Sequence, residues 1–144
     1  MTACVRAHTR LDAGLPASKK LCEPVESEDI ELAQQAFLRL HAREPALTAI
    51  IAGHDKLALG CIDGARSIGL SCPKDVSVVG FGDLPLTERL SPTLSTMRVD
   101  LGRVGRLAGD LIIRAIEQPD LPAVHHAITP VFVRRGSIGR GGRR

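Results

Sequence analysis

Residues 50–70, IIAGHDKLALGCIDGARSIGL, hold an apolar run, a Gly-His-Asp triplet and a helix-like pattern. The run completes LTAIIA at 47–52, whose continuous apolar character is typical of a buried parallel strand. After the triplet, apolar residues recur at helical spacing until Gly69, which is placed to end the helix as a C-terminal cap. DVSVVGF at 75–81 then predicts a second strand, rich in β-branched residues. The stretch therefore predicts a strand–helix–strand unit.

This unit also predicts where a ligand would bind. A crossover of this length implies two parallel strands whose carboxyl ends meet at the same edge of the sheet. His54 and Asp55 then follow one strand, and Gly82 and Asp83 end the other. Ligands of open α/β sheets lie in the crevice beyond such ends. No phosphate-binding glycine loop and no nucleophile in a recognisable turn accompany these residues, so we expect a binding protein and not an enzyme.

Further elements are expected on both sides of the unit. Ser27 is the expected N-cap of one helix, and Asp100 is the expected cap of another that continues to about residue 117. AITPVFVRR at 127–135 predicts a last strand, for which Pro130 favours an edge position. We therefore expect an α/β fold with a parallel sheet flanked by helices.

Positive charge is concentrated at the end of the chain. RRGSIGRGGRR at 134–144 carries five arginines and no acidic residue, whereas the net charge of the chain is +3. The remaining residues therefore sum to −2. Such a segment can contact nucleic-acid phosphates, but a solvated chain end is the more frequent outcome. The basic stretch alone does not predict a DNA-binding domain.

The four cysteines show no spacing typical of a zinc site. We expect free thiols, with no disulfide framework, no bound metal and no cofactor. No stretch approaches the roughly 20 apolar residues that cross a bilayer, and no secretory signal opens the chain. These features predict a cytoplasmic protein without membrane contact.

Taken together, the motifs resemble the LacI/GalR family of transcription regulators. The family pattern has a Thr-Ala-apolar strand, Asn-Asp, an ALG helix and a P-x-D-V-S-V-V-G-F-D-D segment. Here the corresponding residues are TAIIA at 48–52, ALG at 58–60, PKDVSVVGF at 73–81 and a closing VFVRRGS at 131–137. The resemblance covers about residues 27–138.

The resemblance implies a periplasmic-binding-protein-like sensor domain, of which this chain would be a truncated C-terminal part. Residues 1–26, with a weak helical stretch near 5–12, would be an irregular remnant of that domain. Residues 139–144 would be a basic Gly/Arg tail. The helix at 100–117 would pack in an N-terminal subdomain that this chain lacks. Its leucines and isoleucines should therefore be exposed and favour association.

The resemblance also implies effector contacts at Arg6, His54, Asp55, Gly82 and Asp83. His54 stands where the family has Asn, and Gly82 where it has the first Asp of a pair that accepts sugar hydroxyls. Glycine offers no side-chain acceptor, so we expect no tight binding of a neutral sugar. Helix capping by Asp55 with an exposed His54 imidazole beside it, and bracing of its loop by Asp83, remain alternatives to ligand contact.

Two kinds of partner follow from the same resemblance. Leu59, Asp63, Leu86 and Leu90 would face a second subunit in a homodimer, unless the leucines are ordinary core residues. DNA would be contacted only through a helix-turn-helix that this chain does not contain. We expect the effector-sensing and dimerisation part of a LacI-type regulator, a sugar- or metabolite-responsive repressor. The alternatives are a solute-binding protein of an uptake system and an orphan dimerisation fragment that binds no ligand.

Overall fold

The computed structural model describes residues 3–7, 21–122 and 124–139, with the side chains of 3–7 excepted. The strands form one six-stranded sheet in the order β2-β1-β3-β4-β5-β6. β3, β4 and β5 are parallel neighbours, and the outer pairings are antiparallel. The α/β prediction is confirmed, with a parallel centre inside a mixed sheet. In chain order the elements are β1 (Ala3–Ala7), β2 (Cys22–Val25), α1 (Ile30–Arg43), β3 (Ala49–Ala52), α2 (Asp55–Ser67), β4 (Ser77–Gly82), the 3-10 helix η3 (Pro85–Glu88), β5 (Ser95–Arg98), α3 (Leu101–Glu117) and β6 (Val131–Val133).

Two local predictions near the N-terminus are wrong. The weak helical stretch predicted near 5–12 is wrong for residues 5–7, which belong to β1, because strands β2 and β3 pair with it on both sides and this pairing overrides local preference; residues 8–12 lie outside the described residues. The N-cap of α1 is Asp29 and not Ser27, since the Asp29 carboxylate accepts a hydrogen bond from the Leu32 amide at 2.9 Å. Glu31 then lies in the first turn, where the helix dipole favours acidic residues.

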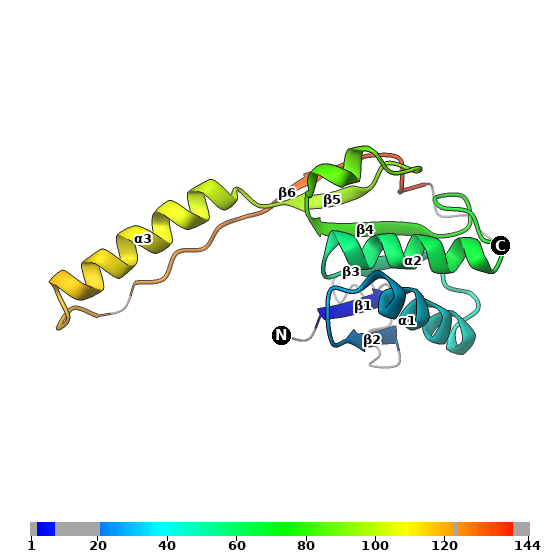
Figure 1. Cartoon of the computed structure of the whole chain (residues 1–144), viewed down its shortest axis with the longest axis horizontal. Helices are drawn as coiled ribbons and strands as arrows, with labels where there is room; N and C mark the ends of the chain where they lie inside the picture. The colour runs from blue at the N-terminus through cyan, green and yellow to red at the C-terminus, as the bar shows by residue number, and fades with distance from the viewer. Residues whose placement is uncertain (1–2, 8–20, 123, 140–144) are drawn as a thin grey trace.

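Helices α1 and α2 pack against each other on one face of the sheet (Figure 1). Their contact depends on Gly60, where an added Cβ would lie 2.3 Å from the Ile30 carbonyl oxygen and 2.6 Å from Ala33 Cβ. Phe37 on α1 and Leu57 on α2 are fully buried between the helices and the sheet. Gly69 follows α2 with a φ of +80°, which agrees with its predicted role at the helix end.

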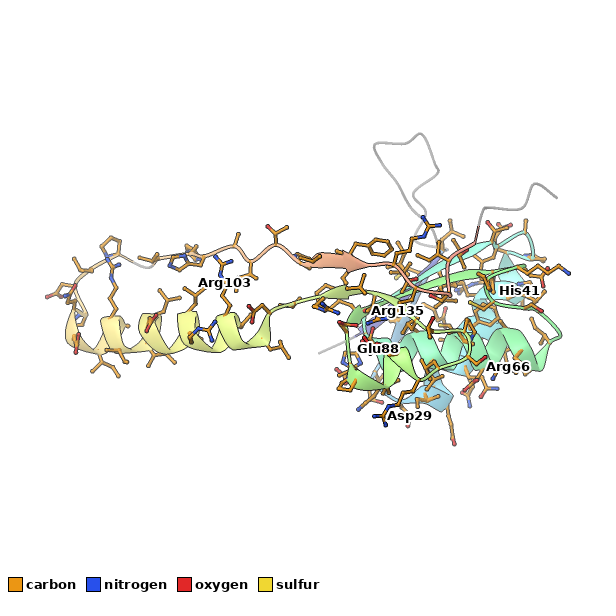
Figure 2. The ribbon with its side chains drawn as sticks, turned by 90° about the horizontal axis from the view of Figure 1, so that it is seen from above. Asp29, His41, Arg66, Glu88, Arg103 and Arg135 are labelled. Carbon is orange, nitrogen blue, oxygen red and sulfur yellow. The ribbon has the colours of Figure 1, made fainter. Side chains whose placement is uncertain are left out.

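The opposite face of the sheet carries exposed apolar side chains. Among the described residues no helix covers this face (Figure 2). Ile51 on β3, Phe81 on β4 and Phe132 on β6 remain 49%, 41% and 47% exposed. By strand register they lie on the side away from the buried Ile50 and Val78, since neighbouring strand residues point to opposite faces.

Helix α3 stands apart from the sheet. It is joined to the sheet by β5 on one side and by the segment that returns to β6 on the other (Figure 1). Asp100 caps it as predicted, accepting a hydrogen bond from the Arg103 amide at 2.9 Å. No α3 residue is buried, and Ile116 is 75% exposed. The predicted exposure is confirmed for Leu101, Ile112, Ile113 and Ile116, whereas Leu107 and Leu111 are partly buried.

The thiol prediction holds for only part of the chain. Cys61 and Cys72 are free, but Cys22 is disulfide-bonded, so the expectation of free thiols throughout is wrong. In the described part of the chain no helix is long and apolar enough to cross a membrane. The same residues contain no group of three His, Cys, Asp or Glu side chains placed to hold a metal ion.

Candidate functional site

The carboxyl ends of β3 and β4 lie side by side, as the sequence predicts. The two strands are parallel, with Ile51 opposite Val79. A Cβ added to Gly82 would lie 3.5 Å from Asp55 Oδ2 and 4.0 Å from His54 Nε2. Residues 53–55 and 82–84, here called the carboxyl edge, therefore form one surface built from two separate segments.

Asp55 is the buried anchor of this edge. Its side chain is fully buried, Oδ2 accepts a hydrogen bond from the Leu84 amide at 2.7 Å, and Oδ1 accepts one from Thr96 Oγ1 at 2.6 Å. The carboxylate thus joins the start of α2 to the loop after β4 and to β5. It also lies in the first turn of α2, where the helix dipole stabilises a negative charge. With both oxygens bonded, Asp55 holds the carboxyl edge together and does not face solvent.

His54 caps α2 and faces the open side of the edge. Its Nδ1 accepts a hydrogen bond from the Lys56 amide at 3.3 Å, so the cap that the sequence suggested for Asp55 comes from His54. In the neutral ring the proton is then on Nε2, which lies 3.5 Å from Glu28 Oε2. The side chains of His54 and Glu28 are 22% and 52% exposed, so both are accessible from solvent.

Asp83 is held by two arginines. It has a left-handed φ of 59°, and its carboxylate accepts hydrogen bonds from Arg98 Nε and, at 2.8 Å, from Arg135 Nη1. Thr87 Oγ1 adds a longer contact at 3.3 Å. Burial raises the pKa of Asp83, but the hydrogen bonds and charges of Arg135 and Arg98 outweigh it and hold the pKa below its usual value. Of the two roles considered for Asp83, loop bracing is the one visible in these contacts.

Arg135 belongs to the fold and not to a solvated tail. It also contacts Glu88 at 2.8 Å, and Figure 2 shows the two side by side. Ser137 is buried, donates a hydrogen bond to the Val78 carbonyl oxygen at 2.6 Å and accepts one from the Ser95 amide at 2.8 Å. The expectation of a solvated segment from residue 134 onward is therefore wrong for 135–139. Residues 140–144 lie outside the described residues.

The remaining candidate residues are placed as follows. Arg6 lies on β1 in register with Ile51, one strand away from the carboxyl edge, and its side chain lies outside the description. Leu59, Asp63 and Leu86 are partly exposed on α2 and η3. Asp63 accepts a hydrogen bond from Arg66 at 2.9 Å. Leu90 packs partly against the core.

Sequence reasoning missed the donors that hold the two aspartates. Thr96, Arg98 and Arg135 come from strands and loops far along the chain, and no local motif joins them to Asp55 or Asp83. A general signal was available, because a buried carboxylate is almost always hydrogen-bonded. That signal predicts that partners exist, but it does not say which residues they are.

An open α/β sheet with polar groups gathered at the carboxyl ends of its parallel strands defines a class of ligand-binding proteins. The periplasmic binding protein-like domain family matches residues 3–138. The chain belongs to this family, as a LacI-type sensor domain.

Known relatives agree with this assignment. The transcriptional regulator MalR of Streptomyces coelicolor is 35% identical over 120 residues, which cover 78% of this chain and 35% of the regulator. The lactose operon repressor of Rhizobium radiobacter is 37% identical over 90 residues, covering 62% of this chain and 80% of that protein. The crystal structure of a LacI family transcriptional regulator from Arthrobacter in complex with lactose superposes with a TM-score of 0.68 at 31% identity, over 78% of this chain and 42% of that one. The chain thus spans about a third of the length of the MalR regulator.

Proposed function

We propose that the chain is the effector-sensing and dimerisation part of a LacI-type transcription regulator, with residues 27–138 as its sensor part and the carboxyl edge as its effector site. The observation that carries the proposal is the convergence of His54 and Gly82 beside the buried Asp55. The relatives are transcription regulators, and a similar protein was crystallised with lactose. We therefore propose a sugar or another small polar metabolite as the effector.

The groups available at this edge set the kind of ligand that it favours. The carboxylates of Asp55 and Asp83 already accept hydrogen bonds from donors within the protein. At the exposed side of the edge, His54 Nε2 lies 3.5 Å from Glu28 Oε2 and the Lys56 ammonium lies 4.0 Å from the same oxygen, so a ligand acceptor would compete with Glu28 for these donors. The Arg98 guanidinium, which is half exposed, is a further donor beside Asp83. The edge therefore suits a ligand with at least one acceptor group near His54.

Gly82 explains why a neutral sugar should bind weakly. Its φ of +123° is a conformation that L side chains rarely adopt, so an aspartate at this position would be strained. Without that carboxylate, and with one side of the edge open, the polar contacts that orient a ligand are few. We expect binding in the millimolar range, about −4 kcal/mol.

Isothermal titration calorimetry against a panel of neutral sugars, acidic sugars and nucleobases tests the effector proposal. His54→Ala should abolish the heat of the best ligand, and Leu32→Ala, on the exposed start of α1, should not change it. Micromolar binding of a neutral sugar would contradict the interpretation of Gly82. Binding that survives His54→Ala unchanged would contradict the site.

We also propose that Leu59, Asp63, Leu86 and Leu90 form a dimer surface. Leu59→Asp would place an unpaired charge in such an interface and should strongly weaken the dimer. Leu32→Asp is the matched control, because it adds the same charge at the start of α1. Equal association of both variants in sedimentation experiments would argue against this surface.

DNA binding and localisation complete the proposal. We propose that the regulator acts in the cytoplasm and contacts its operator through a helix-turn-helix that is not part of this chain. The chain alone should then bind DNA only through phosphates, and the binding should disappear as salt is raised. A gel-shift assay with a sequence preference that persists at physiological salt would refute this part.

A further inference from the structure

Glu28 brings a third carboxylate to the carboxyl edge, from the segment that joins β2 to α1. Its Oε2 atom lies 3.5 Å from His54 Nε2 and 4.0 Å from Lys56 Nζ. Both distances exceed the usual length of a hydrogen bond. Glu28 therefore lies beside two donors and forms a close bond with neither.

Exposure separates Glu28 from the two aspartates of the edge. Asp55 is fully buried and the Asp83 side chain is 8% exposed, and both carboxylates accept hydrogen bonds within the protein. The Glu28 side chain is 52% exposed. An ion pair in contact with solvent contributes little to stability, because water and salt screen it. A ligand group can therefore replace the contacts of Glu28 at little cost, whereas it cannot replace those of Asp55 or Asp83.

His54 Nε2 connects Glu28 with the open space above Gly82. This nitrogen lies 4.0 Å from a Cβ added to Gly82, and 3.5 Å from Glu28 Oε2. In the neutral ring it carries the proton, since Nδ1 accepts a hydrogen bond from the Lys56 amide. A hydroxyl group placed above Gly82 can therefore accept a hydrogen bond from Nε2 and donate its own proton to Glu28.

We propose that Glu28 is the hydroxyl acceptor that selects the effector, with His54 and Lys56 as donors to the same part of the ligand. This role rests on the proposed effector site and adds a requirement to it, namely a ligand hydroxyl group that donates. An ionised carboxylate only accepts, and its hydrogen bonds are stronger than those between neutral groups. An ether oxygen at this position could accept from His54 but would leave Glu28 without a donor. The site should therefore distinguish a free hydroxyl group from an alkylated one.

Lactose and fully O-methylated lactose form the test pair, because methylation keeps the oxygen acceptors and removes every hydroxyl donor. Amide chemical shifts of the isotope-labelled chain, read at residues 53–55 and 82–84, give the dissociation constant of each sugar. Loss of a hydrogen bond to a charged acceptor should raise this constant at least about ten-fold. Equal constants for the two sugars would overturn the proposal.

Glu28→Gln separates the lost hydrogen bond from the added bulk of the methyl groups. It keeps the shape of the side chain and removes the charge, at a half-exposed position that the fold does not need. The constant for lactose should rise at least about three-fold in this variant, whereas the constant for methylated lactose should not change. Glu26→Gln is the matched control, since it removes an exposed carboxylate two residues earlier and should leave both constants unchanged.

The possible outcomes distinguish the role of Glu28 from the effector site itself. If lactose moves the signals of the carboxyl edge with the same constant in the parent and in Glu28→Gln, the edge binds the sugar but Glu28 is not its acceptor. A smaller constant in Glu28→Gln would show that Glu28 competes with the ligand for His54, and it would also overturn the proposal. If neither sugar moves these signals in any of the chains, the effector site is wrong and the role of Glu28 is wrong with it.

Discussion

Replacing Asp55 with alanine should destabilise the fold more than any other single change at the carboxyl edge. The substitution leaves the Leu84 amide and the Thr96 hydroxyl without their shared acceptor in a fully buried place. Hydrogen bonds to a charged group contribute about 1.5–3 kcal/mol each, and an acidic residue at a helix start adds about 0.3–1 kcal/mol. Summed over the two bonds, the free energy of unfolding should fall by roughly 3–7 kcal/mol, a large share of the usual stability of a domain.

Urea unfolding followed by far-UV circular dichroism is the suitable assay, because the chain has no Trp or Tyr for fluorescence. All variants should be compared at one low protein concentration, so that self-association does not contribute. Thr96→Val removes one donor and keeps nearly the same volume, so it should cost about 1.5–3 kcal/mol. The double variant should cost less than the sum of the single variants, since both remove the same bond. A loss below about 1 kcal/mol for Asp55→Ala would refute the anchoring role of this carboxylate.

Three further predictions concern packing, pH and thiol reactivity. Gly60→Ala should lower the free energy of unfolding by about 1–3 kcal/mol because the added methyl group forces α1 and α2 apart. Gly105→Ala, in open space on α3, should instead raise the free energy of unfolding by about 0.5–1 kcal/mol. Urea unfolding compares the two variants, and equal effects would contradict the close contact between α1 and α2. Because the folded-state pKa of Asp83 is lowered, its contribution to stability is complete above the ordinary aspartate pKa of about 3.9 and is lost as the pH falls through the lower folded-state value. The stability advantage of the parent over Asp83→Asn should therefore shrink as the pH falls through this range in acid titrations of both chains. An advantage that does not change with pH would show that the ionised Asp83 carboxylate does not contribute to stability. Burial raises the pKa of the Cys72 thiol to about 11. Iodoacetamide at neutral pH should therefore modify Cys72 slowly in the folded chain and quickly in urea. Rapid modification of the folded chain would show that the thiol is accessible.

The parts of the fold that were predictable depend on short-range patterns. The apolar run before His54, the helical spacing after it and the glycine that ends the helix each act within a few residues. The cap of α3 at Asp100 is equally local. The meeting of the two strand ends followed from topology, because parallel strands joined by a helix end at the same edge.

The parts that were not predictable depend on distant partners. Strand β1 forms because β2 and β3 flank it, which a stretch of five residues cannot reveal by itself. In the sequence Arg135 belongs to a basic chain end, and its hydrogen bonds to Asp83 and Glu88 become visible only in the folded structure. Likewise, the residues next to Asp55 in the sequence do not predict its hydrogen bond with the hydroxyl of Thr96, which lies 41 positions away.

The central claim is that the carboxyl edge is the effector site, and amide chemical shifts of the isotope-labelled chain test it most directly. Titration with lactose and with acidic sugars, to concentrations that populate a millimolar complex, should move signals clustered at residues 53–55 and 82–84. Signals around the hollow lined by Thr48, Val79 and Ile138, on the uncovered face of the sheet, should stay in place. Shifts that cluster at that hollow, with the carboxyl edge unchanged, would contradict the account.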